Sequence, residues 1–223
     1  MTNRLRITSV IILLLAVTEA FAADVAQTMA LPKPRTSRGS PLLDALAHRQ
    51  SVREYAATKI PDQLLSDLLW AACGVNRPDS GKRTAPSTMN SQEIDIYVAR
   101  EDGLFRFQPE THSLTLIMAK DLRALTGRQP FLATAPIDLI YVADLTRLAV
   151  HKPSGGMSEN DGPSYAFCDT GFIAQNLYLF CASEGLGTVV VGNVDRDALG
   201  SAMGIQSTQR ITLTQPVGYP KKP

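Results

Sequence analysis

The pattern Arg49-x-Ser51-x-Arg53 places two guanidinium groups and a hydroxyl at alternating positions. In an extended segment, side chains two residues apart point to the same side, so all three groups can contact one ligand. Each guanidinium can donate two hydrogen bonds to a phosphate, and the hydroxyl can donate one more. The segment is a candidate phosphate-binding site; the alternative is a solvated charged turn that closes a helix.

A second polar segment, residues 74–92, is long for a loop in a compact domain. It contains three basic residues, Arg77, Lys82 and Arg83, followed by a run of small polar side chains up to Ser91. Loops of this length usually carry function. We therefore expect a ligand-binding loop here, with a solvated surface loop as the alternative.

Motifs for other kinds of chemistry are incomplete or missing. Gly185-Leu186-Gly187 lacks the third glycine of a dinucleotide fingerprint, and it joins a helix to a strand rather than a strand to a helix. There is no P-loop, GxSxG elbow or HExxH motif. The three histidines share no metal-site spacing. The remaining groups suit a phosphorylated cofactor lying across the domain.

Three cysteines, Cys73, Cys168 and Cys181, give no disulfide framework because their number is odd. Cys168 and Cys181 are expected on one helix, about 20 Å apart, which is too far for a bond between them. We expect all three to be small buried hydrophobic residues.

The N-terminus has the three parts of a secretory signal peptide: a basic start, an apolar run from Ile7 to Val17 and a small-x-small site at Ala20-Phe21-Ala22. The run is short for a spanning helix, although an N-terminal membrane anchor is the alternative. We predict a signal peptide over residues 1–22, an extended arm over 23–39 and a single domain over 40–223. The protein is then exported, to the periplasm, with no stable membrane insertion after cleavage.

Charge and length limit the classes of protein to which the chain can belong. Without the leader, 20 basic and 20 acidic residues balance, which leaves no electrostatic footprint for nucleic acid or anionic membrane. About 200 residues suit one domain with a sizeable core.

Hydrophobic patterns predict both helices and strands in the domain. The longest helix, over 164–184, is apolar around most of its circumference, which is typical of a domain centre or a subunit interface. The first helix carries Leu42, Leu43, Leu46 and Ala47 on its expected buried side. Residues 151–163 form a lid or a connector, and we favour the connector. Further helices are expected over 61–73, 120–126 and 195–203, and strands over 93–98, 104–107, 112–118, 137–142, 188–191 and 210–214.

Several segments together resemble the FMN-dependent nitroreductase family, in particular its thiazoline-oxidase-like dehydrogenase branch. The resemblance covers about residues 40–220, and the order and spacing of its motifs carry it. These motifs are Arg49-x-Ser51-x-Arg53, Pro86-Ser87-x-x-Asn90-x-Gln92, Gly171 with Gln175-Asn176-Leu177, Gly185-Leu186-Gly187-Thr188, Val191-Gly192 and Gly218-Tyr219-Pro220.

The resemblance implies an α+β fold with an antiparallel-dominated central sheet flanked by helices. It also implies a homodimer that holds FMN at its interface, with the 164–184 helix as the dimer core. The implied reaction is ping-pong: NAD(P)H reduces FMN, and a small electron acceptor such as a nitroaromatic compound or a quinone is then reduced.

The resemblance also assigns cofactor-binding residues. The segment Arg49, Gln50, Ser51 and Arg53 would bind the FMN phosphate, with Lys221 or Lys222 as a further cation. The loop residues Pro86, Ser87, Thr88 and Asn90 would lie along the flavin and ribityl chain, and the backbone N–H near Gly192 would face flavin N5. Separately, we infer that Lys82 or Arg83 stabilises negative charge at flavin N1.

Two features depart from the family pattern. After Gln92 the sequence continues as Glu93-Ile94, where the family often has Pro-Trp. Export would also separate the protein from cytoplasmic NAD(P)H. The alternatives are therefore an exported flavin- or ligand-binding protein of the same fold without turnover, or a structural dimer.

Overall fold

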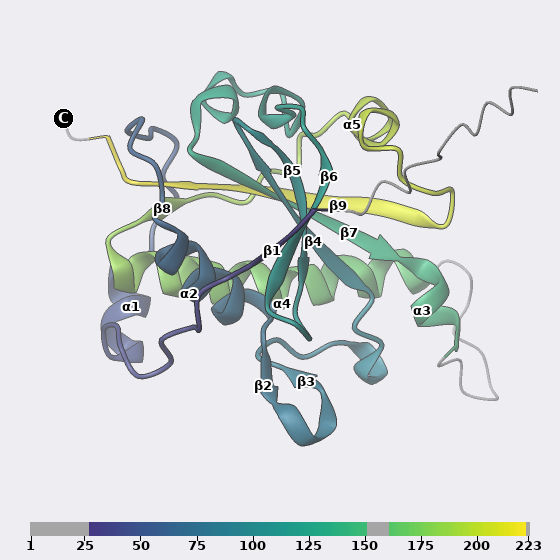
Figure 1. Ribbon diagram of the computed structural model, residues 1–223, viewed down its shortest axis with the longest axis horizontal. Helices are drawn as coiled ribbons and strands as arrows, with labels where there is room; N and C mark the ends of the chain where they lie inside the picture. The colour runs from purple at the N-terminus through teal and green to yellow at the C-terminus, as the bar shows by residue number, and fades with distance from the viewer. Residues whose placement is uncertain (1–26, 151–160, 222–223) are drawn as a thin grey trace, which may run out of the picture.

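The computed structural model describes residues 27–150 and 161–221. A seven-stranded sheet forms the centre, in the order β1-β6-β5-β4-β7-β9-β8, and every adjacent pair is antiparallel. The predicted antiparallel-dominated α+β fold is confirmed (Figure 1). The strands are β1 Thr28–Ala30, β4 Ile94–Arg100, β5 Gly103–Gln108, β6 Ser113–Met118, β7 Ile137–Asp144, β8 Gly187–Thr188 and β9 Gln209–Gly218.

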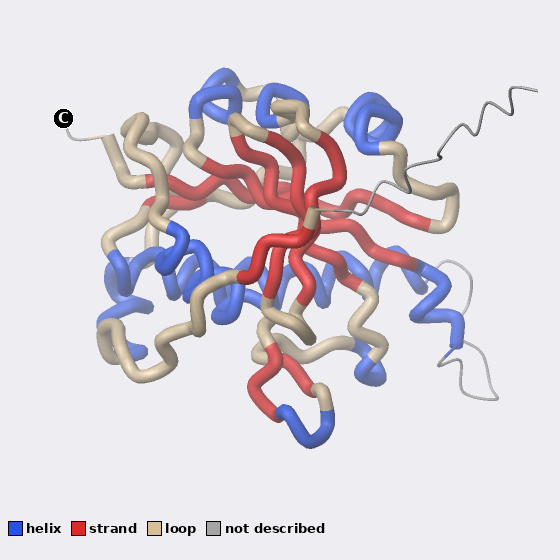
Figure 2. The backbone as a smooth tube through the Cα atoms, viewed as in Figure 1, coloured by secondary structure: helices blue, strands red, loops and turns tan. Residues whose placement is uncertain are grey.

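Helices cover both faces of the sheet (Figure 2). One hydrophobic cluster joins the sheet to α2 and α4, and a second joins it to α5 and the short helical turns near Leu122 and Leu132. Among the described residues, no helix has both the length and the hydropathy to cross a bilayer. The helices are α1 Leu42–His48, α2 Asp62–Cys73, α3 Leu145–Val150, α4 Asp161–Glu184 and α5 Arg196–Met203.

The long helix α4 packs one face against the sheet and exposes two aromatic side chains, one on either side of that face. Ile173, Leu177 and Cys181 recur at helical spacing and are at most 3% exposed. Phe167 and Phe172 are 38% and 44% exposed. The helix begins at Asp161, so residues 161–163 are helical and do not belong to the predicted connector; residues 151–160 lie outside the described residues.

The predicted buried side of the first helix is wrong. Leu42, Leu43 and Leu46 are 62%, 76% and 45% exposed, and only Ala45 of α1 is buried. α1 packs against α4, and the leucines lie outside the buried part of α1. The three leucines and the two exposed phenylalanines of α4 are large apolar side chains that stay exposed in the described part of the chain.

Three local predictions also differ from the structure. Residues 120–126 contain only the short 3₁₀ turn Arg123–Leu125, because the Asp121 side chain accepts the Arg123 N–H and competes with a helix. The strand expected over 188–191 stops at Thr188, since the Val190 N–H bonds to a tyrosine hydroxyl instead of a strand. Cys168 is exposed on α4 and not buried.

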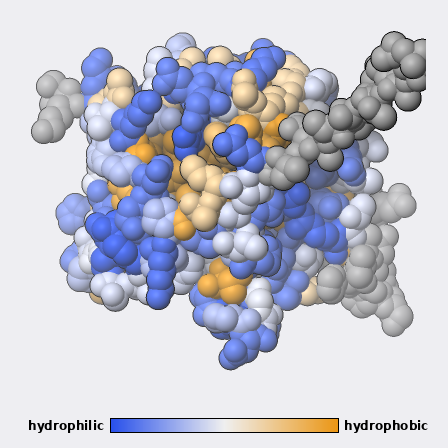
Figure 3. All heavy atoms as spheres, in the orientation of Figure 1, coloured by the Kyte–Doolittle hydropathy of each residue, from blue (hydrophilic) through white to orange (hydrophobic). Residues whose placement is uncertain are grey.

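The loop predicted over 74–92 has internal structure. The short strands β2 Val75–Arg77 and β3 Lys82–Arg83 form a hairpin, which projects from the lower side of the molecule in Figure 1. On the face shown in Figure 3, hydrophilic side chains surround smaller apolar patches over the sheet.

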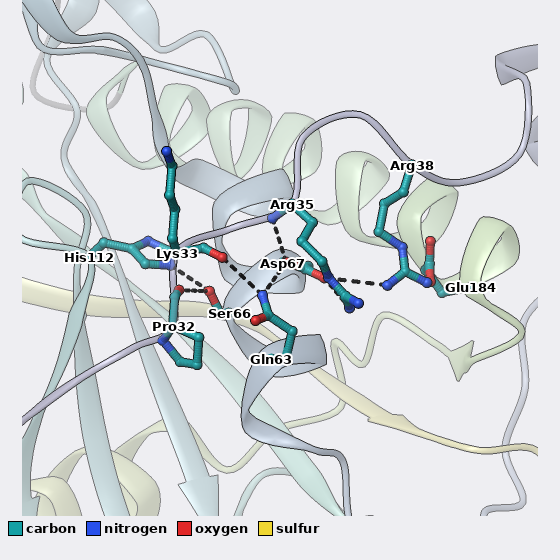
Figure 4. A network of polar contacts seen from close by, with 9 residues as sticks. All are labelled: Pro32, Lys33, Arg35, Arg38, Gln63, Ser66, Asp67, His112 and Glu184. Carbon is teal, nitrogen blue, oxygen red and sulfur yellow. Dashed lines mark hydrogen bonds and ion pairs between the residues drawn. The ribbon is translucent and has the colours of Figure 1, made fainter.

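An extended arm precedes α1 and is fixed by side-chain contacts (Figure 4). Arg35 donates to Asp67 of α2 from its backbone N–H at 2.7 Å and from Nη2 at 2.6 Å. Ser66 donates to the Pro32 carbonyl and lies 2.7 Å from His112 Nε2. Burial opposes ionisation of Asp67, but the hydrogen bonds from Arg35 hold its pKa below the usual range.

Candidate functional site

The Arg49–Arg53 segment leaves α1 in an extended conformation and lies beside β8. The Val52 N–H donates to the Thr188 carbonyl at 3.0 Å, and Ser51 forms a parallel bridge with Thr188. This close approach requires a glycine, because a Cβ on Gly187 would lie 2.7 Å from Val52 Cβ. Gly187 therefore allows the Arg49–Arg53 segment to pack against the edge of the sheet.

The chain terminus lies along the other side of this segment. Tyr55 bridges Pro220, and the Lys221 N–H donates to the Glu54 carbonyl at 3.0 Å. The structure thus brings the Lys221 backbone next to the Arg49–Arg53 segment, although the two are far apart in sequence. Lys222 lies outside the described residues.

Tyr178 of α4 is the residue on which Arg49 and Ser51 converge. The Arg49 guanidinium carbon lies 5.4 Å from the centre of the Tyr178 ring, within cation–π range. The Tyr178 hydroxyl is 3.2 Å from Ser51 Oγ and accepts the Val190 N–H at 2.9 Å. One tyrosine therefore orients two of the predicted phosphate-binding groups and the backbone after β8.

The other two predicted residues of this segment are exposed. Arg53 and Gln50 both reach solvent. Gln50 lines a small cavity of about 220 Å³ together with Val52, Tyr178 and Pro220. The exposed guanidinium and hydroxyl donors next to a tyrosine form a donor set that fits a phosphate.

The Pro86–Gln92 loop has an unusual backbone. Met89, Asn90 and Gln92 have φ values of 51°, 57° and 49°, in the left-handed region that side chains disfavour. Ser87 stabilises this shape, because its Oγ accepts the Gln92 N–H at 3.0 Å and its carbonyl accepts the Asn90 N–H at 3.0 Å. Pro86 and Asn90 are exposed. Strained conformations of this kind concentrate at functional sites.

A buried carboxylate on α4 holds this loop from below. Asp169 is 1% exposed and accepts two hydrogen bonds from Thr88, from the N–H at 2.7 Å and from Oγ1 at 3.2 Å. Beside it, Glu93 is fully buried and accepts a hydrogen bond from Ser91 Oγ at 2.6 Å. The Ser87 and Thr88 hydroxyls thus both contribute to the structure of the loop.

The sequence analysis missed Tyr178, Asp169 and Glu93. The first two belong to a helix whose apolar composition predicted only packing. Glu93 could have been noticed from the sequence, because an acidic residue stands where the family pattern often has Pro. No local pattern shows that α4 passes under both polar segments.

The backbone at Gly192 is fixed by the Arg196 side chain and by β9. Arg196 Nη2 donates to the Gly192 carbonyl at 3.3 Å and to the Thr212 carbonyl at 2.8 Å. Val191 pairs with Thr214 by two backbone hydrogen bonds of 2.8 and 3.1 Å. Gly192 itself is exposed, and a Cβ there would meet only Leu213, at 3.7 Å. The chain leaves the face of this glycine open to a ligand.

The predicted role of Arg83 at flavin N1 does not fit its surroundings. Arg83 is buried, donates to Glu110 at 2.8 Å and lies 3.7 Å from Cys73 Sγ. Burial lowers the pKa of Arg83, but Cys73 and Glu110 outweigh it and raise the pKa above the usual range. Arg83 is therefore committed to internal partners, whereas Lys82 is exposed.

The two polar segments occupy different positions along α4. Tyr178 and Asp169 are nine residues apart, which corresponds to about 13 Å along a helix. The small cavities beside them also differ: one is lined by Gln50 and Tyr178, the other by Pro86 and Asp169. Within one chain, the predicted phosphate-binding and flavin-binding residues therefore form two separate groups.

The fold and these groups define an α+β protein with an antiparallel sheet and a candidate anion-binding segment at the sheet edge. The family model described as "Nitroreductase family" matches residues 46–219. The chain belongs to the nitroreductase family.

Relatives of known sequence or structure agree with this assignment. A Methanocaldococcus jannaschii protein assigned as a nitroreductase is 35% identical over 161 residues, covering 68% of this chain and 78% of the relative. A solved structure from Ralstonia eutropha JMP134, also assigned as a nitroreductase, is 39% identical with a TM-score of 0.81, covering 88% of this chain and 90% of that chain.

A more distant structure shares the fold alone. It is a Desulfovibrio desulfuricans protein, assigned as a nitroreductase and solved in complex with FMN, at 20% identity and a TM-score of 0.58, covering 83% of this chain and 89% of that chain.

Proposed function

We propose that this protein is an FMN-dependent oxidoreductase that transfers electrons from NAD(P)H to a small acceptor. The observation that carries the proposal is the convergence of Arg49 and Ser51 on Tyr178, beside the backbone of Lys221. These groups suit the FMN phosphate, and Arg53 and the Lys221 or Lys222 side chains add positive charge around it. The fold shared with an FMN-bound nitroreductase supports the same cofactor.

The rest of the cofactor site is proposed from the second group and from Gly192. Pro86, Ser87, Thr88 and Asn90 line the flavin and ribityl chain, and the backbone N–H near Gly192 faces N5. Lys82 provides the cation near N1, because Arg83 is paired with Glu110. When bound, FMN supplies two-electron transfer between NAD(P)H and an acceptor such as a nitroaromatic compound or a quinone, in a ping-pong sequence.

We further propose that the active form is a homodimer with FMN at its interface. The exposed leucines of α1 and phenylalanines of α4 form apolar surface of the kind that a partner covers. The proposed phosphate-binding group contacts α4 at Tyr178 and the proposed flavin-binding loop contacts it at Asp169, about 13 Å apart along the helix. The N-terminal signal pattern supports a periplasmic location, and the motif spacing supports the thiazoline-oxidase-like branch.

The test is the visible absorption spectrum of the purified mature protein, before and after NADPH addition under nitrogen. A flavin spectrum that bleaches supports the oxidoreductase. A stable flavin spectrum favours a cofactor-binding protein without turnover or with another reductant. A colourless protein that takes up no added FMN contradicts the proposal.

The double variant Arg49→Ala, Arg53→Ala tests the phosphate site. Losing two charge-assisted contacts of about 1.5–3 kcal/mol each weakens FMN binding by about 3–6 kcal/mol. Lys59→Ala with Arg210→Ala is a matched control, because it removes two exposed cations elsewhere. Unchanged flavin retention in the Arg49, Arg53 variant would refute the phosphate-site assignment.

A further inference from the structure

Two carboxyl groups are buried side by side beneath the Pro86–Gln92 loop. Glu93 is 0% exposed and Asp169 is 1% exposed. Both oxygens of Asp169 accept hydrogen bonds from Thr88. Glu93 accepts from Ser91 with Oε2, and its Oε1 is buried without a hydrogen-bond partner in the described part of the chain.

We infer that Glu93 and Asp169 hold one proton between them, on Glu93, and that this proton keeps the Pro86–Gln92 loop in its ligand-binding shape. The inference deepens the proposed function and rests on it for the identity of the ligand. Two adjacent carboxylates cannot both ionise cheaply in a buried site, so one stays protonated. A neutral Glu93 leaves Asp169 as the charged acceptor that fixes Thr88. Both acids act on the loop as positioning residues.

The charged groups around the pair already have other partners. Arg83 of β3 lines the same small cavity as Asp169 but is paired with Glu110 and lies against Cys73 of α2. Arg147 of α3 donates to the Gln92 carbonyl at 2.8 Å and pairs with Asp95 at 2.7 Å. Although Arg83 Nε is buried without a hydrogen-bond partner, no ion pair in the described part of the chain joins a cation to either acid, which leaves a proton to relieve their repulsion.

The titration of Glu93 agrees with this geometry. Burial raises the pKa of Glu93 to about 7, and the Asp169 carboxylate contributes in the same direction against the hydrogen bond from Ser91. Above that pH, a second negative charge develops beneath the loop. Repulsion then favours conformations in which Thr88 leaves Asp169, and the ligand-binding shape of the loop becomes less populated.

The first test measures the FMN dissociation constant by flavin fluorescence from pH 5.5 to 9. For the wild type, one-proton linkage predicts that affinity falls by up to tenfold per pH unit above about pH 7. Glu93→Gln keeps a neutral hydrogen-bonding group, so its affinity lacks this fall. The FMN phosphate itself titrates near pH 6, but it does so with both proteins. The difference between the two pH profiles therefore reports the titration of Glu93. Identical pH profiles would overturn the inference.

The second test needs no cofactor. Amide hydrogen exchange of the apoprotein reports whether the Thr88 N–H is held by Asp169. The protection factor at Thr88 is expected to fall between pH 6 and pH 8.5 in the wild type and to stay constant in Glu93→Gln. Equal protection in both proteins at both pH values would overturn the proton pair. Failure to bind FMN at every pH would refute only the proposed function, and the exchange measurement would still decide the inference.

Discussion

Tyr178 connects the residues of the phosphate site more directly than their own sequence pattern does. Its ring lies under Arg49 and its hydroxyl contacts Ser51 and the Val190 N–H. The ring orients a guanidinium, whereas the hydroxyl contacts the Ser51 side chain and fixes the backbone at Val190. The two roles can be separated by substitution.

Tyr178→Phe keeps the ring contact with Arg49 and removes the hydroxyl. We expect FMN affinity to fall about tenfold, because the lost hydrogen bonds are worth about 1–2 kcal/mol together. Fluorescence titration with FMN measures this change. Tyr165→Phe is the control, since Tyr165 lies on the same helix and is 39% exposed. Equal affinity of the Tyr178→Phe protein and the wild type would show that the hydroxyl does not orient the site.

At the residue scale, sequence analysis identifies groups that act through local spacing. The alternation of Arg49 and Ser51 fits the extended backbone of this segment, and both side chains contact Tyr178; their binding of a phosphate together with Arg53 stays a prediction. Asp169 and Glu93 are adjacent only because α4 passes below the start of β4. Spacing along the chain does not encode such a contact.

Among the elements, the arm before α1 is fixed mainly by one buried carboxylate. Asp67 of α2 accepts three hydrogen bonds from Arg35 and one from Gln63. Its side chain is 1% exposed, whereas that of Arg35 is 48% exposed and partly screened by solvent. The contact therefore stabilises the arm moderately.

Asp67→Asn is expected to lower the free energy of unfolding by about 1–2 kcal/mol at pH 7, because the charge-assisted bonds to Arg35 are lost. The pKa of Asp67 is lowered in the folded state, so its contribution is present above the unfolded-state pKa and is lost as the pH falls through the folded-state pKa. Urea unfolding at pH 7 and at acid pH measures both effects. The assignment of Asp67 as an ionised hydrogen-bond acceptor would be contradicted if the difference in unfolding free energy between the wild type and Asp67→Asn grew at acid pH.

Element types were more predictable than the directions that their side chains face. The periodicity of α1 and α2 gives both helices within a few residues. The apolar side of α1 nevertheless faces outward, because a hydrophobic stripe looks the same whether it meets its own core or another chain. The strand after Gly187 is short because Tyr178, remote in sequence, takes the Val190 N–H.

At the scale of the whole molecule, the cofactor site that we propose consists of two groups of residues that lie apart on one chain. Arg49, Ser51 and Lys221 lie by β8, and the Pro86–Gln92 loop lies nearer the start of α4. Exposed apolar side chains on α1 and α4 accompany them. In the proposed two-fold dimer, the Arg49–Arg53 segment of each chain meets the Pro86–Gln92 loop of its partner if the shared surface runs along α4.

Subunit complementation tests this arrangement. One chain carries Arg49→Ala and Arg53→Ala, the other carries Thr88→Ala and Asn90→Ala, and mixed dimers are isolated through two different affinity tags. Each variant alone is expected to bind little FMN. In a mixed dimer with interface sites, one site contains both defects and the other contains neither, so the dimer binds half of the wild-type amount. Flavin absorbance per dimer measures this fraction. Mixed dimers without flavin would place both groups of the site within a single chain, and failure of the wild type to dimerise would exclude an interface site.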